Sequence, residues 1–256
     1  MKIHTYKNKE ELTNELARWI SDLIDTTLQN QEFFTLVLSG GETPKNLFKA
    51  LASARFKEKI NWEKIQLFWG DERVVPFNDD RNNAKMAYDL LIDNVGVPAS
   101  QVHIMRTDIE PIFASKEYEK ILHHFFDNTD KSFDLVLLGM GDDGHTLSLF
   151  PNSPLLNEQN GNWVNAVYNE AQQMSRITLM PEIVNRASHI AFMIEGKKKS
   201  LVLKKVIEGK YSPVEFPAQT IKPVIGELCW FLDEDAAKDL NESKKEANDG
   251  YQKPFS

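Results

Sequence analysis

Asp143 and His145 are the residues whose types and spacing first indicate chemistry. They lie in a glycine-rich segment, Gly-Met-Gly-Asp-Asp-Gly-His over residues 139–145, that follows the apolar run 133–138. The run predicts a buried strand, and open α/β sheets hold their ligand sites just beyond the carboxyl ends of such strands. The unperturbed pKa of histidine, about 6.5, allows proton transfer near neutral pH. His145 is therefore a candidate proton-transfer group.

The glycines of this segment also match the G-x-G-x-x-G pattern of dinucleotide-binding loops. Two features of the sequence oppose that interpretation. Asp142 and Asp143 would repel a pyrophosphate, and Pro151 and Pro154 leave little room for the long helix that should follow. We therefore expect neither a nicotinamide nor a flavin cofactor at this segment.

A second segment, Ser-Gly-Gly-Glu-Thr-Pro over residues 39–44, separates an apolar strand pattern from a helix pattern that begins at Pro44. Glycines let the backbone approach a ligand closely, and the free N–H groups of a helix N-terminus favour an anion. Four residues could form such a phosphate cradle: Ser39, Gly40, Gly41 and Thr43. The same residues also suit a tight turn in which Ser39 or Thr43 caps the helix. The segment alone does not separate the two interpretations.

A third segment, Gly-Asp-Glu-Arg over residues 70–73, follows another strand pattern. Three successive charged residues at a strand end often form only a solvated edge. Arg73 has a more specific use, because a guanidinium binds phosphate or carboxylate through two hydrogen bonds. We expect the adjacent acids, Asp71 and Glu72, to orient it.

Two further basic positions could bring a cation to the same edge of the sheet. Arg176 precedes an apolar strand pattern at residues 177–180, and three lysines, 197–199, open a helix pattern after the strand pattern at 189–194. A lysine run is usually a solvated helix face. Helix starts normally prefer acids, however, so the misplaced charge favours an anion-binding role for one of the three lysines; we name Lys197 as the candidate, and the sequence does not separate it from Lys198 and Lys199.

Composition narrows the classes of function. The chain has 256 residues, 41% of them hydrophobic, and a formal net charge of −8, which suits one domain over residues 1–256 and disfavours a nucleic-acid partner. Because the chain has a single cysteine, Cys229, it forms neither an internal disulfide nor a cysteine-rich zinc site. Cys229 lies in an apolar run, which predicts that it is buried in the core. No histidines show the i, i+4 spacing of a helical metal site, so we expect no metal. No apolar stretch approaches the roughly 20 residues of a membrane span, which predicts a cytoplasmic protein without membrane contact.

The elements that must position these segments alternate between strand and helix patterns. Apolar runs of strand length occupy residues 33–39, 65–69, 102–105, 133–139, 163–167, 177–180, 189–194 and 228–232. Helical spacing of apolar residues occupies 10–29, 44–53, 83–94, 111–128 and 197–208. An acidic helix is expected near 233–245 within a C-terminal segment of about 233–256, with a loose end after residue 248. The alternation predicts a Rossmann-like α/β fold, a mostly parallel twisted sheet with helices on both faces in a single domain.

Together the three segments resemble the 6-phosphogluconolactonase family, and the resemblance covers nearly the whole chain. Its most specific part is Ser-Leu-Phe-Pro at residues 148–151, shortly after His145, which distinguishes lactonases from the related glucosamine-6-phosphate deaminases. Deaminases of this superfamily carry a catalytic glutamate where this chain has Phe150. One departure is Leu147, at a position where the family often has alanine.

The resemblance implies a small-molecule sugar-phosphate lactone as substrate and no cofactor. The implied reaction is the hydrolysis of 6-phospho-D-glucono-1,5-lactone to 6-phospho-D-gluconate, the second step of the oxidative pentose phosphate pathway. His145 would take a proton from water and return it to the ring oxygen, while Asp143 orients the imidazole. The expected assembly is a monomer or a small homo-oligomer.

Some roles and two alternative functions stay open at this point. One of two groups, Arg73 or the Gly40–Gly41 loop, would stabilise the developing oxyanion, and the other would bind the phosphate. The sequence does not decide which group has which role. Arg176 and one lysine of the run 197–199 would complete phosphate binding. The alternatives are a glucosamine-6-phosphate deaminase or isomerase, which Phe150 opposes, and a sugar-phosphate sensor that binds without turnover.

Overall fold

The computed structural model describes residues 1–157 and 161–241. Six strands form one parallel sheet, in the spatial order Lys2–Tyr6 (β1), Glu227–Asp233 (β9), His189–Ile194 (β8), Leu135–Leu138 (β5), Phe34–Leu38 (β2) and Ile65–Trp69 (β3). Every residue of β2, β3 and β5 is buried, as expected for parallel strands that are covered on both faces. The predicted α/β fold class is confirmed.

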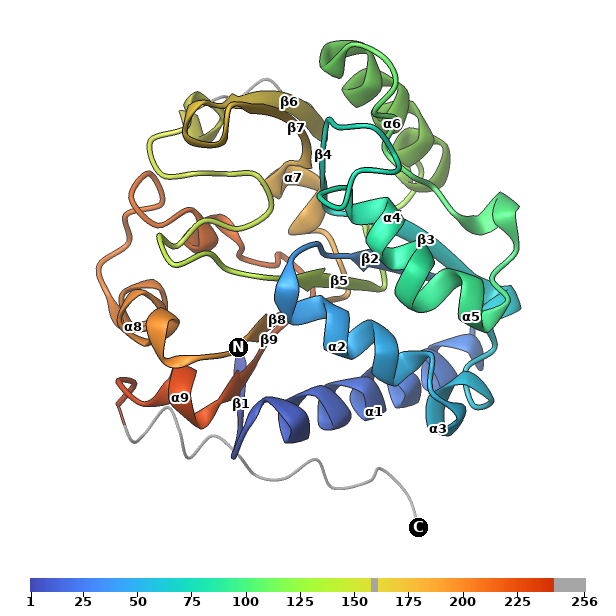
Figure 1. The fold of residues 1–256 in the computed structure, drawn as a ribbon, viewed down its shortest axis with the longest axis horizontal. Helices are drawn as coiled ribbons and strands as arrows, with labels where there is room; N and C mark the ends of the chain where they lie inside the picture. The colour runs from blue at the N-terminus through green and yellow to red at the C-terminus, as the bar shows by residue number, and fades with distance from the viewer. Residues whose placement is uncertain (158–160, 242–256) are drawn as a thin grey trace.

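Helices surround this sheet (Figure 1). The longest, α1 (Lys9–Leu28), starts at Asn8, whose side chain accepts hydrogen bonds from two backbone N–H groups of the first turn. It packs against α2 (Glu42–Leu51), whereas α8 (Ser200–Glu208) packs against α9 (Glu234–Ala237) on the other side of β1 and β9. The remaining α-helices are α3 (Ala54–Lys57), α4 (Asn83–Ala87), α5 (Asp93–Val95), α6 (Pro111–Phe126) and α7 (Pro181–Val184).

A second, antiparallel sheet has the order β4 (Asp71–Arg73), β7 (Met174–Leu179) and β6 (Val164–Asn169). The sequence predicted strands near β6 and β7 but not their separation from the main sheet. Gly70 joins the two sheets, because its N–H donates to Leu38 O while its carbonyl accepts from Leu179 N–H. Apolar periodicity identifies a strand but not its partner.

One strand prediction is corrected by the structure, and two strands were missed. Residues 102–105 do not form a strand: Val102 makes a single parallel bridge to Leu67, directly after a 3-10 turn at Ala99–Gln101. The apolar pattern there reflects packing instead, since the His103 ring stacks on Phe68 with centroids 4.7 Å apart. Conversely, β1 and β4 were not predicted as strands.

Several helix boundaries differ from the predicted ones, and the short helices α3 and α7 were not predicted. The pattern at 83–94 divides into α4, a five-residue π turn and α5, and residues 197–199 form a 3-10 turn before α8. The helix α2 begins at Glu42, two residues before Pro44. After β9 only the short α9 is helical up to residue 241, and the rest of the predicted acidic segment lies outside the described residues.

The strand order reverses between β2 and β5. From β2 the chain continues outward to β3, and from β5 it continues in the opposite direction through β8 to β9. A crevice at the carboxyl ends of two strands at such a reversal is the usual ligand site of open α/β sheets. The segments after β2 and β5 are the two glycine-rich loops found in the sequence.

Candidate active site

A pocket of about 240 Å³ lies at this reversal point. It brings together residues from all three sequence segments and from two later elements, among them Ser39, Gly40, Gly41, Thr43, Arg73, His145, Arg176 and Lys199. This volume is below the roughly 300 to 1,000 Å³ that is usual for ligand pockets, so the pocket suits a small ligand. We refer to it as the switch-point pocket.

His145 is held by Asp143 in this pocket. Its Nδ1 lies 2.6 Å from Asp143 Oδ1, and its backbone N–H donates to the same oxygen at 3.0 Å. Burial acts to raise the pKa of Asp143, but the side-chain and backbone hydrogen bonds from His145 outweigh it, so that this pKa is lowered overall. The carboxylate thus fixes one ring nitrogen, and Nε2 has no hydrogen-bond partner in the described part of the chain.

Phe150 lies against both His145 and Arg176. Its ring centroid is 4.5 Å from that of His145 and 5.4 Å from the guanidinium carbon of Arg176. A second cavity, of about 530 Å³, adjoins the pocket here; Asp143 and Phe150 line it, and His145 and Gln172 line both cavities. The imidazole is therefore accessible from two sides.

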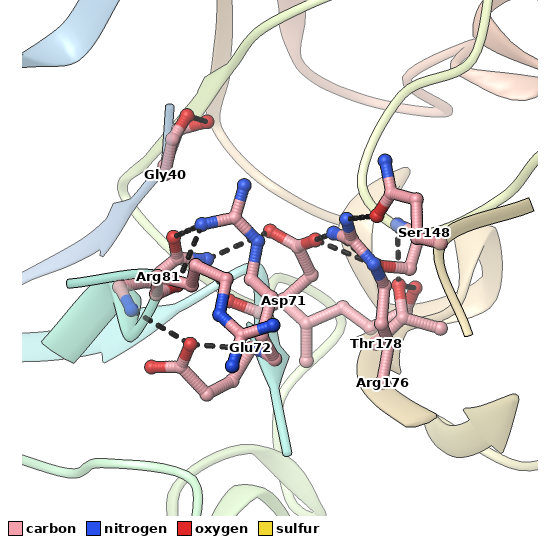
Figure 2. A network of polar contacts seen from close by, with 12 residues as sticks. Gly40, Asp71, Glu72, Arg81, Ser148, Arg176 and Thr178 are labelled. Atoms are coloured by element: carbon pink, nitrogen blue, oxygen red, sulfur yellow. Dashed lines mark hydrogen bonds and ion pairs between the residues drawn. The ribbon is translucent and has the colours of Figure 1, made fainter. Parts of the chain in front are cut away.

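Arg176 lies within β7 and is almost fully buried, with 5% of its surface exposed. Its Nη1 donates to Asp71 Oδ2 at 3.3 Å, and Ser148 Oγ donates to the same oxygen at 2.6 Å (Figure 2). Gln172 accepts a further hydrogen bond from Nη2. Asp71 was expected to orient Arg73, but its carboxylate holds Arg176 instead.

Arg73 is held by a different set of groups. Its Nη1 donates to Asn83 Oδ1 at 2.6 Å and to the carbonyl of Arg81 at 2.8 Å. Glu72 binds only backbone N–H groups, those of Arg73, Asn83 and Ala84. The expectation that the adjacent acids orient the guanidinium is therefore wrong, because both carboxylates are occupied elsewhere.

The lysine in the pocket is Lys199. Lys197 is exposed and does not line the pocket, because residues 197–199 form a 3-10 turn that presents only the third lysine to it. Burial lowers the pKa of Lys199, and its ammonium has no hydrogen bond or ion pair within residues 1–157 and 161–241. An unpaired cation in a pocket is suited to an anionic ligand.

The loop after β2 leaves the start of α2 without a side-chain cap in the described part of the chain. Gly41 occupies the N-cap position with a φ of 100°, a conformation that glycine adopts without strain. The interpretation in which Ser39 or Thr43 caps this helix is therefore wrong. The first amide groups of α2 remain available for an anion at the positive end of the helix dipole.

Comparison with known proteins now decides the family. The family model described as glucosamine-6-phosphate isomerases/6-phosphogluconolactonase matches residues 7–230. The chain belongs to this isomerase/lactonase family. A 6-phosphogluconolactonase of Synechocystis is 36% identical over 237 residues, 91% of this chain and 95% of the relative, and one of Haemophilus influenzae is 37% identical over 201 residues, 78% and 85% of the two chains. The solved 6-phosphogluconolactonase of Trypanosoma cruzi superposes with a TM-score of 0.80 at 25% identity, covering 94% of this chain and 97% of that one.

Three residues at or beside the pocket of this isomerase/lactonase family member were not identified from the sequence. Gln172 lines the pocket, while Asn83 and Ser148 hydrogen-bond to groups that line it. Ser148 offered one signal, because it is a hydroxyl between Leu147 and Leu149 in an otherwise apolar run. The other residues had no such signal, since polar residues at helix starts and in loops are common.

Within residues 1–157 and 161–241, no three His, Cys, Asp or Glu side chains are grouped so that they could hold a metal ion. None of the helices in the same residues is both long and apolar enough to span a membrane.

Proposed function

We propose that this chain is a 6-phosphogluconolactonase, which hydrolyses 6-phospho-D-glucono-1,5-lactone to 6-phospho-D-gluconate. The observation that carries the proposal is the His145–Asp143 pair at the edge of a pocket lined by three cationic side chains, Arg73, Arg176 and Lys199. Relatives of that name, similar over most of this chain, support it.

His145 acts as the general base. When Nδ1–H donates its hydrogen bond to Asp143, Nε2 carries the free lone pair and removes a proton from the attacking water. The hydroxide adds to the lactone carbonyl and gives a tetrahedral oxyanion. The ring C–O bond then breaks, and the imidazolium returns its proton to the departing ring oxygen, so that His145 ends the cycle neutral.

The pocket supplies positive charge for the substrate's phosphate and for the oxyanion that forms during the reaction. The phosphate binds Lys199 and Arg176, while Arg73 and the amides of the Gly40–Gly41 loop serve the oxyanion and the remaining phosphate oxygens. If Arg73 serves the oxyanion, its replacement lowers kcat; if it serves the phosphate, replacement raises KM. Arg73→Lys separates the two roles.

Phe150 favours lactone hydrolysis over deamination. Its ring packs against His145, at the place where the resemblance puts the catalytic glutamate of the deaminases. An aromatic ring there transfers no proton. The cytoplasmic location and the monomeric or small homo-oligomeric state stay predictions from the sequence.

The test is the decay of freshly prepared lactone with wild-type protein, His145→Ala and the control His124→Ala. His124 is an exposed histidine on α6, so its variant should retain full activity. We expect His145→Ala to fall to the spontaneous rate while it still binds 6-phosphogluconate. Turnover by His145→Ala at the wild-type rate would exclude the general-base role. Release of ammonia from glucosamine 6-phosphate without lactone turnover would instead support the deaminase.

A further inference from the structure

Asn83 lies against two of the segments that form the switch-point pocket, residues 39–44 and residues 70–73. It is the first residue of α4 and only 1% exposed. Its Oδ1 accepts the hydrogen bond from Arg73 Nη1 at 2.6 Å, and its Nδ2 donates to the carbonyl of Asp71 at 2.9 Å (Figure 2). A buried amide whose oxygen and nitrogen both have partners is held in one orientation. Arg73 therefore meets an acceptor in a fixed place.

The backbone of Asn83 is fixed as firmly as its side chain. The buried carboxylate of Glu72 accepts the N–H groups of Arg73 and Asn83, both at 2.7 Å, and that of Ala84 at 2.8 Å. One carboxylate thus anchors the main chain of both Arg73 and Asn83. Their side chains then meet across a short distance with little freedom to separate.

The side chain of Asn83 occupies the space that a side chain at residue 40 would need. A Cβ at residue 40 would lie 1.9 Å from Asn83 Oδ1 and 2.2 Å from its Cγ. Gly40 does not have a left-handed φ, so its backbone conformation does not itself demand glycine. The close approach of the Asn83 amide is what excludes a side chain. Asn83 therefore contacts both the Gly40–Gly41 loop and Arg73.

The hydrogen bonds of Arg73 leave its Nη2 group without a partner. Nη1 uses its two protons on Asn83 Oδ1 and Arg81 O, Nη2 makes no hydrogen bond in the described part of the chain, and Nε is buried without a partner. Because Arg73 lines the switch-point pocket, Nη2 is the end of the guanidinium that can donate to a bound anion. We propose that Asn83 is a positioning residue that presents Nη2 of Arg73 to the substrate, and that residue 40 must be glycine to admit Asn83. The kinetic consequence rests on the proposed lactonase function.

The first test compares Asn83→Ala with Arg73→Lys. Loss of a hydrogen bond to a charged group should lower kcat/KM of Asn83→Ala by about 10- to 100-fold. The change should fall in the same parameter, kcat or KM, as the change in Arg73→Lys. When Arg73 is already replaced by alanine, adding Asn83→Ala should lower kcat/KM by less than about threefold further, because there is no guanidinium left to position. Full multiplication of the two effects would overturn the positioning role.

The matched control is Asn82→Ala. Asn82 is equally buried and caps α4 by accepting the N–H of Lys85 at 2.8 Å, but it makes no hydrogen bond to Arg73 in the described residues. Its replacement should lower thermal stability and leave kcat/KM within about threefold of wild type. Equal kinetic losses in Asn82→Ala and Asn83→Ala would mean a merely structural role and would overturn the proposal.

The second test is steric and does not depend on turnover. Gly40→Ala alone should lower the unfolding midpoint, and it should lower it much less in the Asn83→Ala background, where the clashing amide is absent. Equal shifts in both backgrounds would overturn the steric part of the proposal. If wild-type protein fails to accelerate lactone decay, the proposed function fails, while this stability cycle still tests the relationship between Gly40 and Asn83.

Discussion

The imidazole of His145 occupies the space that a side chain at Gly141 would need. A Cβ at residue 141 would lie 2.1 Å from His145 Nδ1 and 2.7 Å from Asp143 Oδ1. The N–H of Gly141 also donates to the carbonyl of His145 at 2.9 Å, which closes the turn. The glycine that resembled part of a dinucleotide loop thus serves the His–Asp pair.

Gly141→Ala should therefore displace the imidazole and separate it from Asp143. We expect kcat to fall by about 100-fold or more, because a general base contributes about 10²- to 10⁴-fold and depends on its position. Gly139→Ala is the control, since a Cβ there meets nothing closer than Ser39 Oγ at 3.9 Å. Lactone decay rates measured in parallel should separate the two variants; similar losses in both would contradict the steric explanation.

Asp143→Asn tests the charge of the pair with little change in shape. The amide oxygen can still accept the backbone N–H of His145, but the negative charge that stabilises the imidazolium is gone. We expect kcat to fall by about 10²-fold with KM within about threefold of wild type, because Asp143 does not line the switch-point pocket. Steady-state kinetics checks this, and a change confined to KM would instead assign Asp143 to substrate binding.

The sequence predicted where the segments of the site lie better than which of their side chains contact one another. Local patterns were sufficient to place His145, Arg73 and the loop after β2 at strand ends, because parallel strands bring their carboxyl ends to one edge. Which carboxylate pairs with which guanidinium depends on contacts between distant segments: Asp71 and Arg176 are 105 residues apart. Apolar periodicity carries no information on such pairs.

The sequence also could not decide which of the three consecutive lysines, 197–199, lines the pocket. A helix pattern that begins at residue 197 gave no reason to prefer Lys199. Only the 3-10 turn, followed by α8 from Ser200, determines which side chain lies toward the pocket. Local backbone geometry at an element boundary is the least predictable part of a sequence-based assignment.

Glu72 should make stability depend on pH. Burial raises its pKa from 4.5 to about 7, despite three backbone N–H groups that favour the carboxylate. Between these two values the folded protein holds a proton that the unfolded chain has lost, so the free energy of unfolding falls as pH rises from 4.5 to 7.

The expected loss attributable to Glu72 is roughly 1 to 3 kcal/mol. Urea unfolding of wild-type protein and Glu72→Gln at pH 5 and pH 8 measures it, because glutamine does not titrate. Wild-type protein should lose more stability than the variant between the two pH values. Parallel losses would show that Glu72 has similar pKa values in the folded and unfolded states.

Lys199 should contribute to the affinity for the substrate, whereas Lys197 should not. The ammonium of Lys199 lines the switch-point pocket without an ion pair in the described residues, whereas Lys197 is exposed outside it. Removing one charge-assisted hydrogen bond to a phosphate should weaken binding by about 10- to 100-fold. Calorimetric titration with 6-phosphogluconate should show this loss for Lys199→Ala and near wild-type affinity for Lys197→Ala.

Gluconate, which lacks the phosphate, is the ligand control for this lysine. Its weak binding should be the same in wild-type protein and in Lys199→Ala, because the ammonium acts on the phosphate rather than on the sugar chain. A larger loss of 6-phosphogluconate binding in Lys197→Ala than in Lys199→Ala would restore the assignment made from the sequence. It would also require the 3-10 turn at Lys197–Lys199 to rearrange when the phosphate binds, since only Lys199 lines the pocket here.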